Sequence, residues 1–352
     1  MRFGTIYKLR EKIRSYYKNM NSVIFISMVL LMAVGLVSIY SATSGAGTSF
    51  FMKQALWYAI GFAVMMVFAN INYNILINMG NWLYGILLVF LVAVLIFGTS
   101  KLGATRWLNI GGFAFQPGEF MKIVMALTLI RYILVKNREA YTVKNIFVMF
   151  IILAVPMVLI LKQPDLGTTL LLIPVALVIF FIGNMPGVKF AAIVGSGLAA
   201  LPVIFLFLKG YQKQRILTFL NPELDPLGSG YNVIQSQIAV GAGEWLGRGW
   251  MQGTQSQLHF IPIRYTDFIF AVIAEEFGFW GSLAVVAIYF VLIMEALKIV
   301  KLCRNVGGKM LAAALTMIFF SQFFINIGMN IGIMPVSYTH LRAHETVLDL
   351  VC

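Results

Sequence analysis

Carboxylates are scarce in this chain, so the positions they occupy carry information about its chemistry. The 352 residues contain 13 Asp and Glu against 26 Lys and Arg. Asp267 lies between Arg264 and a long apolar run, with aromatic residues on both sides. A carboxylate partly removed from water has a raised pKa and can serve as a general base. Asp267 is therefore the first catalytic candidate, with compensation of a helix dipole as the alternative.

Glu275 and Glu276 follow Asp267 in the same apolar run. Neighbouring helical residues diverge by about 100°, so at most one of them can share the direction of Asp267. The other is expected to pair with another helix, because an ionisable group at membrane depth is costly without a partner.

Two further acidic positions stand at predicted helix starts. Glu119 and Lys122 are three residues apart and share a helix face, which fits either an internal ion pair or a role in ligand binding. Asp165 follows Pro164 and precedes an apolar run, where an N-cap is the favoured explanation.

The longest hydrophilic segment, residues 210–266, adds further candidates. Arg215 and the turn-rich run 221–232 could bind a phosphorylated headgroup, although a solvated loop would look similar. The glycine-rich run 241–249 lacks the strand-turn-helix context of a nucleotide loop, which excludes a Rossmann or P-loop site. A lone His259 does not predict a zinc site. Cys303 and Cys352 make no disulfide framework.

These residues must be positioned by a membrane-embedded helical bundle. Hydrophobic residues make up 60% of the chain and charged residues 11%, and a spanning helix needs about 20 mostly apolar residues. We predict an all-α polytopic fold of about nine spans, with the large loop between spans seven and eight. The apolar windows are 22–42, 52–70, 76–98, 118–135, 144–161, 166–183, 188–208, 268–297 and 309–335.

Clusters of Lys and Arg predict the orientation of the bundle. They lie in residues 2–18, 131–144 and 298–309, which fall on one side if there are nine spans, and that side is then cytoplasmic. Residues 1–20 are expected to be a retained, basic cytoplasmic segment rather than a cleaved signal. The same topology explains the net charge of +13, so a nucleic-acid partner is not expected.

Several motifs in order make the chain resemble the SEDS family of peptidoglycan polymerases, the RodA, FtsW and SpoVE group. The matching stretches are Thr105–Leu108, Gln116–Lys122, Gln163–Thr168, Asn221–Asn232, Gly253–Gln257 and Thr266–Ala271. The stretch Gly253–Gln257 looks more like RodA than FtsW. The resemblance runs from the first span to Pro335.

The resemblance implies a glycosyltransferase that joins lipid II units into glycan strands on the outer face of the bacterial cytoplasmic membrane, for cell elongation and shape. It implies Asp267 as the catalytic base. Substrate-binding candidates are Lys122, Glu119, Arg106, Trp107, Asp165, Arg215 and Gln255; among these, Lys122, Arg106 and Arg215 are the cations for the departing pyrophosphate. No metal site on the protein is predicted, but Mg²⁺ or Mn²⁺ could assist the pyrophosphate. Expected partners are a class B penicillin-binding transpeptidase and membrane proteins of the elongation complex.

Two departures from the family stand out. Ile263 replaces a glutamate that many relatives carry. The membrane domain is expected to span residues 21–336, and the family pattern ends at Val336. Residues 337–352 form an atypical polar tail where the family has a tenth helix. We therefore expect a truncated or spliced reading frame. Two other functions stay open: a lipid II flippase, and a non-catalytic scaffold for a transpeptidase.

Overall fold

The computed structural model describes residues 21–44, 48–101, 104–110, 113–207, 210, 213, 229–258, 260–261 and 264–334. Within them, nine long helices correspond to the nine expected spans. They are α2 (Ser22–Ala42), α3 (Ser49–Phe68), α4 (Tyr73–Phe97), α5 (Pro117–Lys136), α6 (Val143–Lys162), α7 (Leu166–Ile182), α8 (Gly187–Phe207), α12 (Ile269–Leu302) and α13 (Val306–Asn330). The expected basic segment 1–20 and the tail 337–352 lie outside the described residues.

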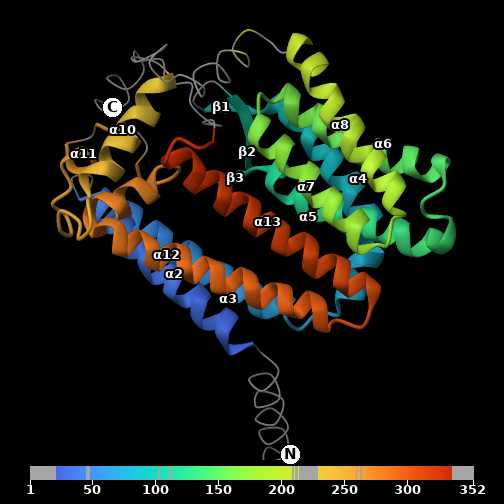
Figure 1. The fold of residues 1–352 in the computed structure, drawn as a ribbon, viewed down its shortest axis with the longest axis horizontal. Helices are drawn as coiled ribbons and strands as arrows, with labels where there is room; N and C mark the ends of the chain where they lie inside the picture. The colour runs from blue at the N-terminus through green and yellow to red at the C-terminus, as the bar shows by residue number, and fades with distance from the viewer. Residues whose placement is uncertain are drawn as a thin grey trace, which may run out of the picture.

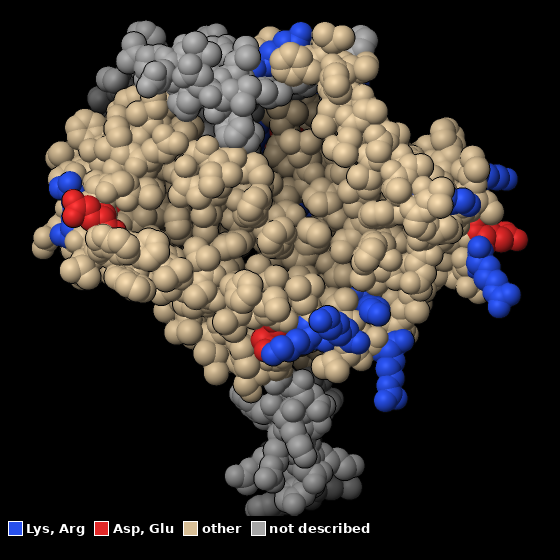
Figure 2. Space-filling view, viewed as in Figure 1, with Lys and Arg blue, Asp and Glu red and all other residues tan. Residues whose placement is uncertain are grey.

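Six of the helices are long and apolar enough to cross a membrane: α2, α3, α4, α6, α12 and α13, with α7 and α8 as shorter apolar helices. Figure 2 shows a broad uncharged band on the visible face, with Lys, Arg, Asp and Glu confined to its edges. The chain is therefore an integral membrane protein.

Helix α5 carries four charged residues and is enclosed by other helices of the bundle. Along α5, Met121, Met125, Leu129 and Ile130 are fully buried against α4, α6, α7 and α13. Helix α13 joins this group to the pair α2 and α12, since it packs on both α7 and α12, and Figure 1 shows it running between the two groups. Asn and Asp caps start α2, α4, α7 and α13.

The segment between α4 and α5, which separates the predicted spans 76–98 and 118–135, forms a small antiparallel sheet. Its strands are β1 (Thr99–Lys101), β2 (Ala104–Ile110) and β3 (Phe113–Phe115), in the order β1-β2-β3. Ser100 pairs with Thr105, and Leu108 pairs with Phe115. The all-α prediction holds for the bundle, and the sheet is an addition. Two of its strands have only three residues, which leaves almost no periodic pattern in a sequence.

The segment between α8 and α12 contains α10 (Ser229–Ala242), the single-turn α11 (Thr254–Gln257) and a turn-rich stretch between them. That stretch forms backbone hydrogen bonds with α12 at a break in the helix. Gly278 adopts φ 66° and ψ −159°, which interrupts the helix. The backbone N–H of Phe279 donates to the carbonyl of Glu244 at 2.8 Å, and the N–H of Arg248 donates to the carbonyl of Glu275 at 2.9 Å. Backbone groups inside a membrane need such partners, because lipid offers none.

Two of the three basic clusters, 131–144 and 298–309, lie at one end of the bundle, and the third, in residues 2–18, lies outside the described residues. The cluster after α5 and the one between α12 and α13 lie together, since Ile133 and Val306 line the same pocket. The first described residue, Asn21, donates from its side chain to Glu295 near the end of α12, at 3.2 Å. The start of α2 therefore lies at the same end, as the charge pattern predicted.

Candidate functional site

Asp267 lies at the opposite end of the bundle, two residues before α12 begins. The next residue, Phe268, is buried in a small apolar cluster with Val233, Ala271 and Met329. This cluster joins α10, α12 and α13 beneath Asp267. The backbone around the carboxylate is therefore held by packing on three helices.

Two asparagines of α13 are hydrogen-bonded to the backbone of Asp267. The side-chain amides of Asn330 and Asn326 donate to the carbonyl of Asp267, at 2.8 and 3.2 Å. The Asn330 side-chain oxygen accepts the Ala271 N–H at 3.1 Å, and the Ser236 hydroxyl donates to the Asn330 carbonyl at 2.8 Å. Asn330 is fully buried, so it acts as a positioning residue that ties Asp267 to α10, α12 and α13.

The carboxylate of Asp267 has an altered acidity. Burial raises its pKa above the ordinary aspartate value, and the positive charge of Arg106 opposes that rise. No hydrogen bond to this carboxylate is found among the described residues. A carboxylate with a raised pKa can accept the proton of a bound hydroxyl group.

Arg106 on β2 connects Asp267 to the start of α7. It is 8% exposed, and its guanidinium donates to the carbonyl of Pro164 at 2.6 Å and lies 3.9 Å from the Asp165 carboxylate. Asp165 accepts the Thr168 N–H at 3.0 Å and caps α7, as predicted. Gln116 also donates to Asp165, at 3.4 Å. This framework holds the Arg106 charge near Asp267.

Glu119 and Lys122 form an ion pair of 2.7 Å in the first turns of α5. The Lys122 side chain is 2% exposed, whereas that of Glu119 is 41% exposed. The internal ion pair, one of two expectations, is therefore present. An ammonium group has three N–H donors, so Lys122 could donate to an anion as well as to Glu119. That binding role stays a prediction.

The other substrate-binding candidates are placed differently. Trp107 follows Arg106 on β2, and since side chains alternate along a strand, the indole lies on the opposite face. Gln255 belongs to α11, on the α10 side of the site, and its buried side-chain oxygen has no hydrogen-bond partner within the described part of the chain. Arg215, His259 and Ile263 lie outside the described residues.

Glu275 and Glu276 both have structural partners. Glu275 accepts the backbone N–H groups of Gln255 and Ser256, at 2.7 and 2.9 Å, and so caps α11. Glu276 accepts the hydroxyl of Ser41 at the end of α2, which confirms the prediction that one of the two pairs with another helix. Together they hold α2, α11 and α12 in contact beside Asp267.

The arrangement brings Asp267, Arg106 and Asp165 into one region, with Glu119 and Lys122 at the neighbouring start of α5. Sequence reasoning missed Asn326, Asn330 and Ser41. The two asparagines are four residues apart in a helix with few polar residues and so share one face, a pattern that could have identified them. Among the described residues, no group of three or more His, Cys, Asp or Glu is placed to hold a metal ion.

Comparisons with known proteins give a consistent result. The FtsW/RodA/SpoVE family, described as "Cell cycle protein", matches residues 21–341. The chain is 40% identical to the peptidoglycan glycosyltransferase MrdB of Escherichia coli K12, covering 90% of this chain and 85% of that protein. It is 28% identical to the peptidoglycan glycosyltransferase RodA of Treponema pallidum, covering 89% and 90%.

Solved structures agree on the fold. A structure described under "Structural coordination of polymerization and crosslinking by a peptidoglycan synthase complex" is similar with a TM-score of 0.77 and 26% identity, covering 91% of this chain and 89% of that one. The rod shape determining protein RodA of Thermus thermophilus has a TM-score of 0.66 at 21% identity, covering 91% and 87%, and supports the fold alone.

Proposed function

This chain belongs to the FtsW/RodA/SpoVE family, and from that membership we propose that it is a peptidoglycan glycosyltransferase that polymerises lipid II into glycan strands. The observation that carries a catalytic role is the environment of the Asp267 carboxylate. The side chain is partly buried, its backbone carbonyl accepts a hydrogen bond from Asn330, and the positive charge of Arg106 acts on the carboxylate. We propose that the polymer serves cell elongation and shape.

The reaction forms one carbon–oxygen bond and breaks another. Asp267 removes the proton from the acceptor sugar hydroxyl while that oxygen attacks the anomeric carbon of the donor. The bond from this carbon to the lipid pyrophosphate breaks, and the pyrophosphate leaves with the electron pair. Fixed positive charge stabilises the developing anion, and the cations we propose for this role are Arg106, whose charge acts on Asp267, and Lys122 at the start of α5.

A divalent cation would accompany the pyrophosphate as part of the substrate. Mg²⁺ keeps several waters and binds through one or two carboxylates together with phosphate oxygens. Among the described residues no group of three or more His, Cys, Asp or Glu is placed to hold a metal ion, which fits a metal bound mainly by the substrate. Its chemistry would be to neutralise charge on the leaving group.

The topology supports a reaction at the outer membrane surface. Lys and Arg cluster at the end opposite Asp267, which by the positive-inside rule supports a cytoplasmic N-terminus and an outer position for Asp267. We place the protein in the bacterial cytoplasmic membrane as a multi-pass protein. A class B penicillin-binding transpeptidase and the elongation-complex proteins are the partners we propose, because a similar structure comes from a complex that polymerises and crosslinks.

The direct test is reconstitution of the full chain in liposomes with labelled lipid II and the transpeptidase partner. We expect glycan strands that a muramidase digests. Lipid II translocation between leaflets without strand formation would instead favour the flippase, and normal support of the transpeptidase by a chain that makes no strands would favour the scaffold.

The pH dependence of the reaction provides a separate prediction for Arg106. Asp267 acts as a base only when deprotonated, so activity falls as the pH drops through its pKa. Arg106 lowers that pKa, and Arg106→Gln removes this effect. The acidic limb of the kcat/KM profile should therefore move to higher pH. An unchanged limb would mean that the charge of Arg106 does not act on Asp267, even if the variant is less active.

A further inference from the structure

A pocket of about 470 Å³ lies at the end of the bundle opposite Asp267. It is formed where α5 and α7 end and where α6, α8 and α13 begin. Helix α5 has 20 residues, which at about 1.5 Å per residue separates its two ends by roughly 30 Å. The pocket is therefore separate from the site around Asp267.

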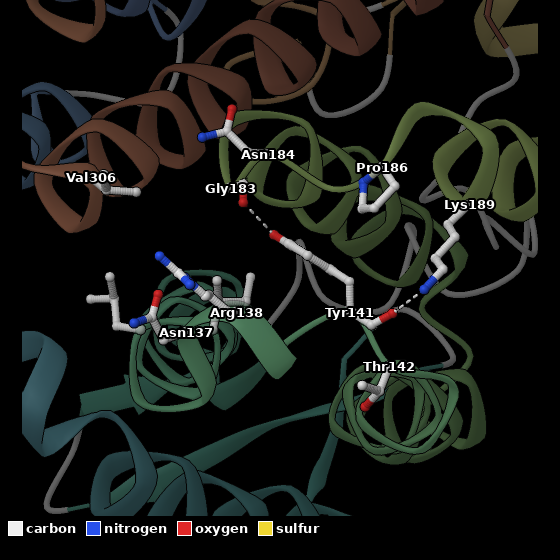
Figure 3. Close-up of a pocket in the computed structure, with 11 residues that line it drawn as sticks. Asn137, Arg138, Tyr141, Thr142, Gly183, Asn184, Pro186, Lys189 and Val306 are labelled. Atoms are coloured by element: carbon white, nitrogen blue, oxygen red, sulfur yellow. Dashed lines mark hydrogen bonds between the residues drawn. The ribbon is translucent and has the colours of Figure 1, made fainter.

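The lining of this pocket is polar and basic. It includes Arg138, Lys189, Asn137, Asn184 and Tyr141. Figure 3 shows the Arg138 guanidinium pointing away from the end of α5, and the Lys189 nitrogen directed at the backbone of Tyr141. Among the described residues, no Asp or Glu lines the pocket, and no ion pair involves Arg138 or Lys189.

Tyr141 gives the pocket a fixed wall. Its hydroxyl donates to the Gly183 carbonyl at 2.8 Å, and its own carbonyl accepts from Lys189 at 2.7 Å. A side chain at position 183 would not fit, because its Cβ would overlap the Tyr141 hydroxyl. Burial raises the pKa of Tyr141 to about 12, so the hydroxyl keeps its proton. The wall holds Lys189 at the rim.

The surroundings of the pocket fit a lipid better than a free anion. Leu134 and Val306 line it and are 40% and 45% exposed. Phe181 and Val188, close in sequence to the lining residues, are 64% and 85% exposed. Exposed apolar side chains next to a basic pocket at the membrane boundary provide contacts for acyl chains below a headgroup. A free phosphate would use only the basic residues.

We propose that this pocket binds the phosphate of an anionic phospholipid of the cytoplasmic leaflet, with Arg138 and Lys189 as its cationic ligands. Helices α6 and α8 begin at the pocket, at Val143 and Gly187, and their partial positive ends add to the attraction. The lipid would bridge the ends of α5 and α7 to the starts of α6, α8 and α13.

The test compares two double variants of the full chain with the same loss of charge. Arg138→Gln with Lys189→Gln removes the pocket cations. The control, Lys301→Gln with Arg304→Gln, removes two cations from the same end of the bundle that do not line the pocket. Phosphatidylglycerol, phosphatidylcholine and inorganic phosphate are each titrated against detergent-purified protein, with retention by native mass spectrometry and thermal stabilisation as readouts.

We expect phosphatidylglycerol to bind the wild type and the control, and to bind the pocket variant about 10- to 30-fold more weakly. The charge-conserving variant Arg138→Lys with Lys189→Arg should retain binding, which separates charge loss from misfolding. Equal weakening in the control and pocket variants would overturn the proposal, because the attraction would then be general. Equal stabilisation by inorganic phosphate would overturn the lipid assignment and leave a site for free anions.

Discussion

Asp267→Asn is expected to lower the rate of glycan-strand formation by about 10²- to 10⁴-fold, the usual contribution of a positioned general base. The substitution keeps the shape of the side chain and removes its ability to accept the proton. The backbone carbonyl of residue 267 still accepts from Asn330 and Asn326, so binding of lipid II should change much less than the rate. Single-turnover rates and lipid II binding, measured on the same preparation, check this.

The same substitution should not unfold the protein. Because burial raises the pKa of Asp267, the folded state disfavours the charged carboxylate, and a neutral amide removes that cost. We therefore expect thermal stability equal to or above the wild type. Glu139→Gln, at the opposite end of the bundle, is the matched control and should leave the rate unchanged. A fully active Asp267→Asn protein would refute the assignment of this residue as the base.

Gly247→Ala is expected to destabilise the protein by a few kcal/mol. Gly247 has φ 81°, and an added Cβ would overlap the Glu276 carbonyl oxygen and lie 2.7 Å from the Gly278 nitrogen. A left-handed conformation costs an ordinary residue about 1–2 kcal/mol, and overpacking adds about 1–3 kcal/mol. The turn-rich segment between α10 and α11, which is hydrogen-bonded to α12 at its break, would have to shift. Helix α11 would shift with it. Thermal unfolding in detergent measures the change.

Gly241→Ala provides the control for this prediction. Gly241 lies in α10 and is exposed, and an added Cβ would meet no heavy atom within 4 Å. Alanine in a helix is favoured over glycine by about 0.5–1 kcal/mol, so this variant should be as stable as the wild type or slightly more so. Equal melting temperatures for the two variants would mean that the contact between residue 247 and the α12 break does not stabilise the fold.

Much of the fold could be predicted because the membrane restricts the choices. A hydrocarbon layer about 30 Å thick requires apolar runs of fixed length, and each of the nine expected windows coincides with a helix. A helix cap could be predicted where a single side chain forms it, as at Asp165, whose carboxylate accepts the Thr168 N–H at the start of α7. The sheet formed by β1, β2 and β3 could not, because its strands are stabilised by pairing with each other rather than by a local pattern.

The break in α12 shows a second limit of the sequence. Residues 268–297 read as one continuous apolar span, and Gly278 alone does not reveal an interruption. The interruption becomes stable only because Glu244 and Arg248, some thirty residues earlier in the chain, supply hydrogen-bond partners for the freed backbone. A feature whose partners are distant in sequence depends on packing, which no local window contains.

The amino-acid sequence by itself determined the membrane-embedded helical class, the end of the bundle that carries the basic clusters, the resemblance to the family and the choice of Asp267. Each follows from hydropathy, charge or a short motif, which are local properties. Only the tertiary structure decided that Asn330 of α13 holds the Asp267 backbone, that Arg106 of β2 acts on the Asp267 carboxylate, and that Glu275 and Glu276 tie α11 and α2 to α12. These contacts join residues far apart in the chain, and their energies exist only once burial has removed water from between them.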